Sequence, residues 1–118
     1  MEVEFYCSDA GNNYVGDAIE ELPAKAAKKI TRVLDRLEKY GAYALMTVTD
    51  QCIKLKGYLN LYELRILCEK VWYRIIFTIK KTTCWLLHFF IKKGNKTPER
   101  EIKTALARSN VLNLKLGF

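Results

Sequence analysis

The sequence predicts an α+β fold in which an antiparallel sheet of four to five strands carries an N-terminal helix pair on one face and a C-terminal helix. Three observations predict this class: an amphipathic helical pattern before residue 41, a series of apolar runs of strand length after residue 52, and a new helix start at Thr97-Pro98. The 118 residues suit one core, so we expect a single domain spanning residues 1–118.

The first part of the chain is predicted to form one short strand and two helices. Residues 2–6 alternate polar and apolar side chains, as a strand does. The pattern is helical over residues 16–40, and Pro23 divides it, because proline is tolerated in a first turn but not in a helix interior. Gly41 ends the second helix. Residues 42–49 carry no clear assignment.

The second part is predicted to form most of the sheet and a last helix. Four runs rich in β-branched, aromatic and leucine residues cover residues 53–56, 59–67, 72–80 and 83–92. The breaks between them are short, which favours antiparallel hairpins. Thr97 as N-cap and Pro98 at the first helical position predict a helix that runs to about Arg108. The tail from Asn110 either packs back in extended form or remains loose.

Side-chain alternation sorts the strands into two faces. One parity is almost purely apolar and is expected to lie against the helices: Tyr62, Leu64, Ile66, Tyr73, Ile75, Phe77, Ile79, Trp85, Leu87, Phe89 and Ile91. The other parity carries Glu63, Arg65, Arg74, His88 and Lys92 among apolar neighbours. Burial of an arginine side chain costs free energy unless the guanidinium is paired with a carboxylate or stays in contact with water. Two interpretations therefore stay open, an Arg74–Glu63 ion pair on a solvated face and a phosphate site built from arginine forks.

Positive charge is concentrated in the second part of the chain. Residues 54–118 hold 14 of the 20 Lys and Arg residues but only 4 of the 13 Asp and Glu residues. Lys92, Lys93 and Lys96 cluster where the last predicted strand ends. This distribution predicts a polyanionic partner, and the alternative is a generally basic, solvated surface.

Several classes of protein are disfavoured by the composition. The N-terminal residues lack the features of a signal peptide, and no window is apolar enough to span a membrane, so we expect a cytoplasmic protein. Four cysteines without a Cys-x-x-Cys pair and a single histidine favour small buried thiols in a reducing compartment, with no metal and no cofactor. His88 is expected to be structural more often than catalytic.

A set of short segments carries a family resemblance. The segments are Leu61–Arg65, Tyr73–Phe77, Phe90–Lys93 and Lys96–Pro98, followed by Glu101 and Ile102. In this order and spacing they resemble the HigB-like, phage-derived branch of the RelE/ParE toxin superfamily, over roughly residues 3–108. The resemblance implies a small RelE-like domain that is the toxin of a type II toxin–antitoxin pair.

The resemblance also implies a partner and a reaction. Such toxins commonly cleave mRNA in the ribosomal A site, and the cognate antitoxin is typically a helix-turn-helix protein that represses the operon together with the toxin. The lack of a metal-ligand cluster in the sequence favours metal-free cleavage by attack of a ribose 2′-OH. Two alternatives stay open: a ParE-like gyrase poison, and a non-catalytic basic module that binds nucleic acid or a protein partner.

The resemblance assigns roles to individual residues. Arg65 and Arg74 fall at the family's Glu-Leu-Arg and Tyr-Arg positions and are expected to stabilise charge on the phosphate. Lys92 or Lys93 is expected to move the proton, with Glu63 and His88 in possible support. The side chains expected to contact RNA are Lys54, Lys56, Lys96 and Arg100. The chain departs from several relatives because the start of its last helix has neither the tyrosine nor the histidine that they use.

Overall fold

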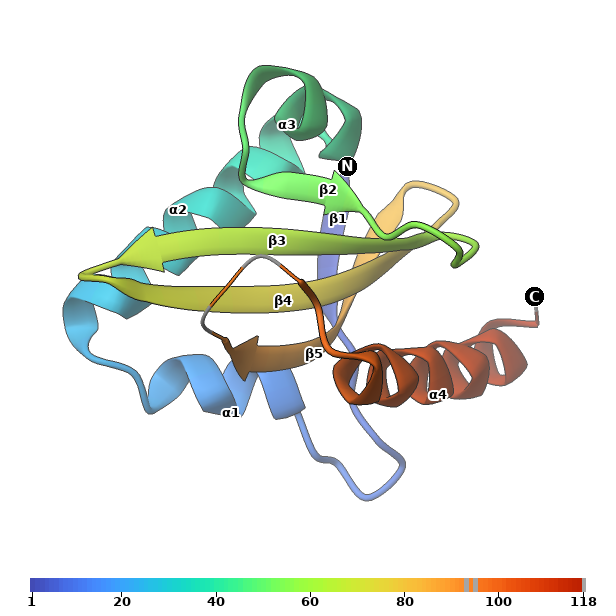
Figure 1. The fold of residues 1–118 in the computed structure, drawn as a ribbon. Coiled ribbons are helices and arrows are strands. Elements are labelled where there is room, and N and C mark those ends of the chain that lie inside the picture. Colours follow the sequence, from blue (N-terminus) through green and yellow to red (C-terminus); the bar gives the residue numbers. More distant parts are fainter. Residues whose placement is uncertain (93, 95, 118) are drawn as a thin grey trace.

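A five-stranded mixed sheet lies between two helical layers in the computed structural model, which describes residues 1–92, 94 and 96–117 (Figure 1). In chain order the elements are β1 (Glu2–Phe5), α1 (Tyr14–Glu20), α2 (Ala24–Tyr40), α3 (Ala42–Val48), β2 (Cys52–Lys54), β3 (Leu61–Cys68), β4 (Val71–Lys80), β5 (Thr83–Ile91) and α4 (Glu99–Leu116). The strand order is β1-β5-β4-β3-β2. The predicted α+β class is confirmed, although the sheet is antiparallel only over β2 to β5, because β1 pairs with β5 in parallel.

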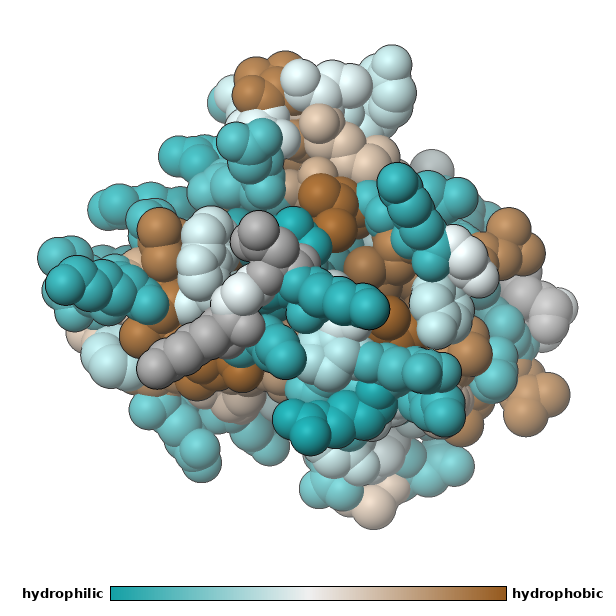
Figure 2. Space-filling model, in the orientation of Figure 1, coloured by the Kyte–Doolittle hydropathy of each residue, from teal (hydrophilic) through white to brown (hydrophobic). Residues whose placement is uncertain are grey.

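The two faces of the sheet carry different layers. Helices α1, α2 and α3 cover one face, and α4 packs on the other (Figure 1). Because α4 is a single helix, it covers only part of this face of the sheet. The part near β2 and β3 has no helix over it. In the same orientation, Figure 2 shows apolar surface at the centre of this region, bordered by hydrophilic side chains.

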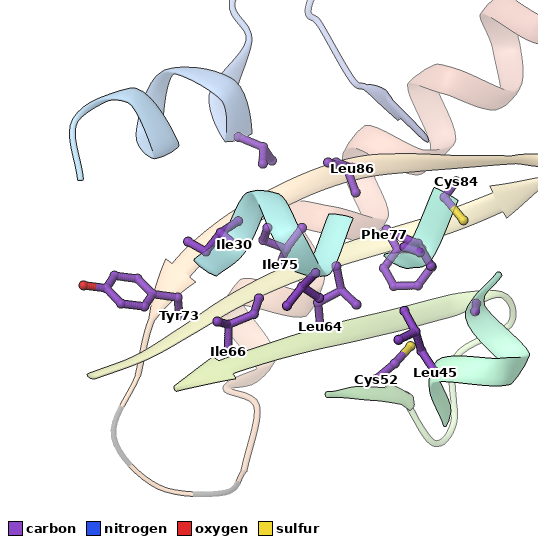
Figure 3. Close-up of a cluster of buried hydrophobic side chains, with 14 of the residues drawn as sticks. Ile30, Leu45, Cys52, Leu64, Ile66, Tyr73, Ile75, Phe77, Cys84 and Leu86 are labelled. Carbon is purple, nitrogen blue, oxygen red and sulfur yellow. The ribbon is translucent and has the colours of Figure 1, made fainter. Parts of the chain in front are cut away.

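The main core lies between the sheet and the N-terminal helices. Ile30, Val33 and Leu37 of α2 form a buried stripe at helical spacing. They pack on the buried face of β3 and β4, which includes Leu64 and Ile75 (Figure 3). The predicted inward parity of β3 and β4 is therefore confirmed.

Strand β5 breaks the predicted alternation. Ile76 pairs with His88 and Phe77 pairs with Leu86, so Leu87 is an extra residue and forms a bulge. Leu86 consequently packs in the main core, whereas Leu87 is buried on the α4 side. The prediction that Trp85 and Leu87 face the N-terminal helices was wrong, because an unbroken period of two cannot reveal an inserted residue.

The last helix differs from its prediction in start and length. It begins at Glu99, and Thr97 makes no capping bond. It continues to Leu116, because the buried stripe of Ile102, Ala105 and Leu112 extends along the sheet. The segment 42–49, which had no assignment, contains the helix α3.

Three of the four cysteines are buried, as expected, but Cys7 is exposed. Burial raises the pKa of Cys52 and of Cys84 to about 12, so both thiols stay protonated near neutral pH. None of the helices in the described part of the chain combines the length and the apolar character needed to cross a membrane.

Candidate functional site

A groove of about 810 Å³ opens on the α4 side of the sheet, between the β2–β3 connection and the start of α4. Five cationic residues line it: Lys54, Lys56, Arg65, Lys92 and Lys96. Its apolar lining comes from Ile53, Leu55, Tyr58, Pro98 and Ile102, and Thr97 and Glu99 complete it. Figure 2 shows this combination as apolar surface with a hydrophilic border. The groove therefore offers positive charge around an apolar floor.

Two arginines lie directly opposite each other beneath and beside this groove. Arg65 of β3 and Arg74 of β4 are partners in the antiparallel register. Like charges in this position repel each other, so they require a counter-charge. The carboxylate of Glu63 supplies it: Oε1 accepts from Arg65 Nε at 2.7 Å and from Arg74 Nη1 at 3.5 Å.

The three members of this cluster differ in exposure. Glu63 and Arg74 are 0% and 1% exposed, whereas the side chain of Arg65 is 22% exposed. Arg65 is therefore the member that reaches solvent and lines the groove. The short hydrogen bond from Arg65 Nε to Glu63 holds one edge of the Arg65 guanidinium and so orients this group.

Arg74 is held beneath the groove. Its Nη2 donates to the carbonyl oxygen of Gly94, and its buried Nε has no hydrogen-bond partner among the described residues. Burial lowers the pKa of the Arg74 guanidinium, while the charge of Glu63 opposes that shift and the charge of Arg65 adds to it. The Arg74–Glu63 ion pair expected for a solvated face is thus present, but it is buried.

The second carboxylate oxygen of Glu63 connects the sheet to α4. Thr97 Oγ1 donates to Glu63 Oε2 at 2.7 Å. The hydroxyl that was predicted to cap the helix is therefore engaged by a buried carboxylate, which is the stronger acceptor because it is charged. Glu63 accepts from residues of β3, β4 and the segment before α4.

His88 belongs to a different cluster. Its Nδ1 lies 3.1 Å from Arg108 Nη1, and its Nε2 lies 3.3 Å from Glu101 Oε1. Arg108 also donates to the Leu87 carbonyl at 2.8 Å and stacks on the Tyr14 ring. A guanidinium only donates, so the contact with Arg108 favours the neutral tautomer of His88 that carries its hydrogen on Nε2. Burial lowers the pKa of His88, and Arg108 lowers it further, against the opposing effect of Glu101.

The structure brings together most of the residues singled out from the sequence. Lys54, Lys56, Arg65, Lys92 and Lys96 share the groove, with Glu63 and Arg74 beneath it. Arg100 is exposed but does not line the groove, and His88 contacts α4 away from it. Lys93 lies outside the described residues. No group of three His, Cys, Asp or Glu side chains in the described ranges is placed to hold a metal ion.

Tyr58 is the groove residue that sequence reasoning missed. It follows Lys54 and Lys56 at a spacing of two, in a stretch read as a strand end and a glycine turn. An aromatic residue interleaved with lysines is a signal of nucleic-acid binding, and it could have pointed to Tyr58.

Comparisons with known proteins agree with this architecture. Residues 17–110 match the family described as phage-derived protein Gp49-like (DUF891). No curated protein matches the chain. Among solved structures, a double arginine-to-alanine mutant of Escherichia coli toxin RelE in the free state matches with a TM-score of 0.59 and 11% identity, over 91% of this chain and 95% of that one.

That likeness shows the fold, and it confirms the RelE-like architecture expected from the sequence. The family match covers most of the chain and includes every residue of the groove. The protein therefore belongs to the phage-derived, Gp49-like family and has the RelE fold.

Proposed function

We propose that this protein is the toxin of a type II toxin–antitoxin pair and that it cleaves mRNA on the ribosome in the cytoplasm. The Gp49-like family and the likeness in fold to a protein named as a toxin support this proposal. The fold alone does not define the target, whereas the groove points to a phosphodiester.

The observation that carries the proposal is the position of Arg65. A buried carboxylate orients its guanidinium at the wall of a groove that four lysines also line. A guanidinium held in this way presents fixed N–H donors to the non-bridging oxygens of a phosphodiester. Preorganised positive charge stabilises a pentavalent phosphorane better than mobile surface charge does.

The proposed reaction needs only groups of the RNA and of the protein. The ribose 2′-oxygen attacks the adjacent phosphorus and loses its proton to a base. The bond between phosphorus and the 5′-oxygen breaks, and that oxygen takes up a proton. The products are a 2′,3′-cyclic phosphate and a 5′-hydroxyl, so water is not consumed and the electrons balance.

Arg65 stabilises the charge on the phosphorane in this proposal. Lys92, which lines the groove, or Lys93 transfers the proton. Arg74 lies beneath the groove and does not contact the phosphate. It contributes through its positive charge beside Glu63 and Arg65 and through its hydrogen bond to the Gly94 carbonyl. The ribosome aligns the 2′-oxygen with the scissile bond and so contributes the positioning that the protein lacks.

A helix-turn-helix antitoxin is the proposed partner, and it binds the operator together with the toxin. The high positive charge around the groove suits a partner with acidic segments, because complementary charge speeds association.

Expression in a growing bacterium tests the function. We expect wild type to halt growth and to produce new 5′ ends in mRNA by primer extension, and Arg65→Ala to do neither. Arg32→Ala is the matched control, since this arginine is exposed on α2 and does not line the groove. Growth arrest with gyrase-linked DNA damage and no new mRNA ends would instead support the ParE-like alternative.

A non-catalytic RNA-binding module is the second candidate. The burial of Arg74 favours it, because an arginine that is 1% exposed cannot contact a phosphate in this conformation. A binding module would tolerate Arg65→Lys with a modest loss, whereas a nuclease that depends on the forked geometry would lose cleavage.

A further inference from the structure

Tyr58 is the aromatic residue among those that line the groove. It lies in the connection between β2 and β3. Lys54, the last residue of β2, and Lys56 precede it in the chain. The ring is half-buried and packs against a second, smaller hydrophobic cluster on the α4 side of the sheet. This cluster includes Leu55, Leu61 and Ile102. Part of the side chain is thus anchored, and part remains open to the groove.

The connection that carries Tyr58 is fixed at its ends. Leu55 N donates to the Leu61 carbonyl at 2.9 Å. Asn60 adopts a left-handed φ of 61°, donates from Nδ2 to the Ile79 carbonyl at 2.5 Å, and accepts from Thr78 Oγ1 at its own carbonyl at 2.7 Å. These contacts tie the turn to β4. A ring on such a turn loses little conformational entropy when a ligand packs on it.

The groove combines two chemistries that match the two parts of a nucleotide. Lysine ammonium groups and the Arg65 guanidinium suit the phosphates, and the tyrosine ring with its apolar neighbours suits the flat face of a base. A duplex keeps its bases stacked inside, so only a single strand can offer a base to this ring. An acidic peptide would satisfy the lysines but would leave the aromatic ring without a planar partner.

We propose that Tyr58 stacks against a base of single-stranded RNA in the groove, while the surrounding lysines contact its phosphates. This inference rests on the proposed function. It adds that the substrate is an unpaired strand and that one of its bases stacks on Tyr58. It assigns the ring face, and not the hydroxyl, as the part that acts. Tyr58 is thereby a binding residue that positions the strand beside Arg65.

A binding experiment without cleavage tests this inference. The probe is a short, fluorescently labelled RNA strand with 2′-O-methyl sugars, in which the attacking hydroxyl is blocked. The comparison strand has the same backbone with abasic sites. Each is titrated with wild type, Tyr58→Phe and Tyr58→Leu. Circular dichroism and thermal unfolding of the three proteins establish that each variant is folded.

We expect wild type to bind the strand with bases roughly 5- to 150-fold more tightly than the abasic strand, the range for stacking of one base on an aromatic ring. Tyr58→Phe should keep this preference because it keeps the ring, and Tyr58→Leu should lose most of it. The matched control is Tyr43→Leu, a tyrosine that is 77% exposed on α3, which should behave as wild type.

Equal binding of the two strands by wild type, or an unchanged preference in Tyr58→Leu, would overturn the inference. Loss of the preference in Tyr58→Phe would also overturn it, since the hydroxyl would then be responsible. These outcomes are separate from the proposed function, because new mRNA ends in cells that depend on Arg65 would still establish cleavage. Conversely, a base preference that depends on Tyr58 would stand for a protein that binds RNA without cutting it.

Discussion

Thr97 donates its hydroxyl hydrogen to Oε2 of the buried Glu63 over 2.7 Å, and this contact joins the segment before α4 to the middle of the sheet. The other carboxylate oxygen of Glu63 accepts from Arg65 and Arg74. One carboxylate therefore offsets part of the charge of two arginines and also holds the segment before α4, so the geometry of the groove and the stability of the fold depend on the same residue.

Removal of the Thr97 hydroxyl should destabilise the protein. In Thr97→Val the shape is retained, but a buried carboxylate oxygen loses its donor, so we expect the free energy of unfolding to fall by about 1–3 kcal/mol. Urea denaturation followed by circular dichroism measures this change. Thr104→Val is the control, because that hydroxyl bonds to the Arg100 carbonyl on an exposed part of α4. Equal effects of the two variants would contradict the role of the contact.

Substitution of Arg74 should mainly affect the stability of the fold, whereas substitution of Arg65 should mainly affect toxicity. Arg74→Ala leaves the Glu63 carboxylate with less compensation in a buried site, and we expect a loss of about 3–5 kcal/mol in the free energy of unfolding. Arg65→Ala removes a partly exposed group and should cost less stability, yet it should abolish the toxicity proposed above. Chemical denaturation beside growth assays would show the separation. A stable Arg74→Ala protein would mean that the pair is not required for folding.

Protonation of His88 should weaken the fold. Its pKa is lowered in the folded protein from the ordinary value of 6.5, mainly by burial. As the pH falls below 6.5, the unfolded chain binds a proton that the folded protein binds only at lower pH, so the free energy of unfolding falls with pH. The groups that face His88 are Glu101 and Arg108 of α4, and a proton on Nδ1 would meet the Arg108 charge.

Thermal unfolding as a function of pH measures this dependence. His88→Gln, which does not titrate but can still donate toward Glu101, should show a smaller loss of stability between pH 7 and pH 5 than wild type shows. Parallel curves for the two proteins would assign the acid sensitivity to other groups.

The groove lysines should determine the salt dependence of RNA binding. Each lysine that neutralises a phosphate of a single strand contributes about 0.7 to the slope of log affinity against log salt, so Lys54→Gln with Lys56→Gln should reduce the slope by about 1.4. Fluorescence anisotropy over a series of salt concentrations gives this slope. Lys28→Gln with Lys39→Gln removes the same charge from α2, away from the groove, and should leave the slope nearly unchanged.

Cys7 should react far faster than the other thiols. It is exposed, whereas Cys52, Cys68 and Cys84 are buried, and burial raises the pKa of Cys52 and Cys84 to about 12. An Ellman titration of native protein should show one fast thiol of the four, with the rest released on unfolding. Cys7→Ser should lose the fast phase, and a second fast thiol in that variant would show that the core opens readily.

Much of the site could be predicted from alternation along the strands. Parity predicts that Glu63, Arg65 and Arg74 share one face, and the observed strand register confirms this. The same reasoning failed in β5, because the bulge at Leu87 exchanges the faces of the residues before it. The local sequence predicts Thr97 as a cap, and this prediction was wrong because its acceptor, Glu63, is 34 residues away in sequence.

The sequence by itself determined the class of fold, the inward faces of β3 and β4, the basic character of the C-terminal half and the family resemblance. These properties depend on local periodicity and composition, which a chain displays along its length. Only the tertiary structure decided that Arg74 is buried while Arg65 is presented to the groove, that Glu63 holds both arginines and Thr97, and that Tyr58 joins the lysines. Burial and contact are set by where distant segments meet, so they emerge only when the sheet, the β2–β3 connection and α4 are packed together.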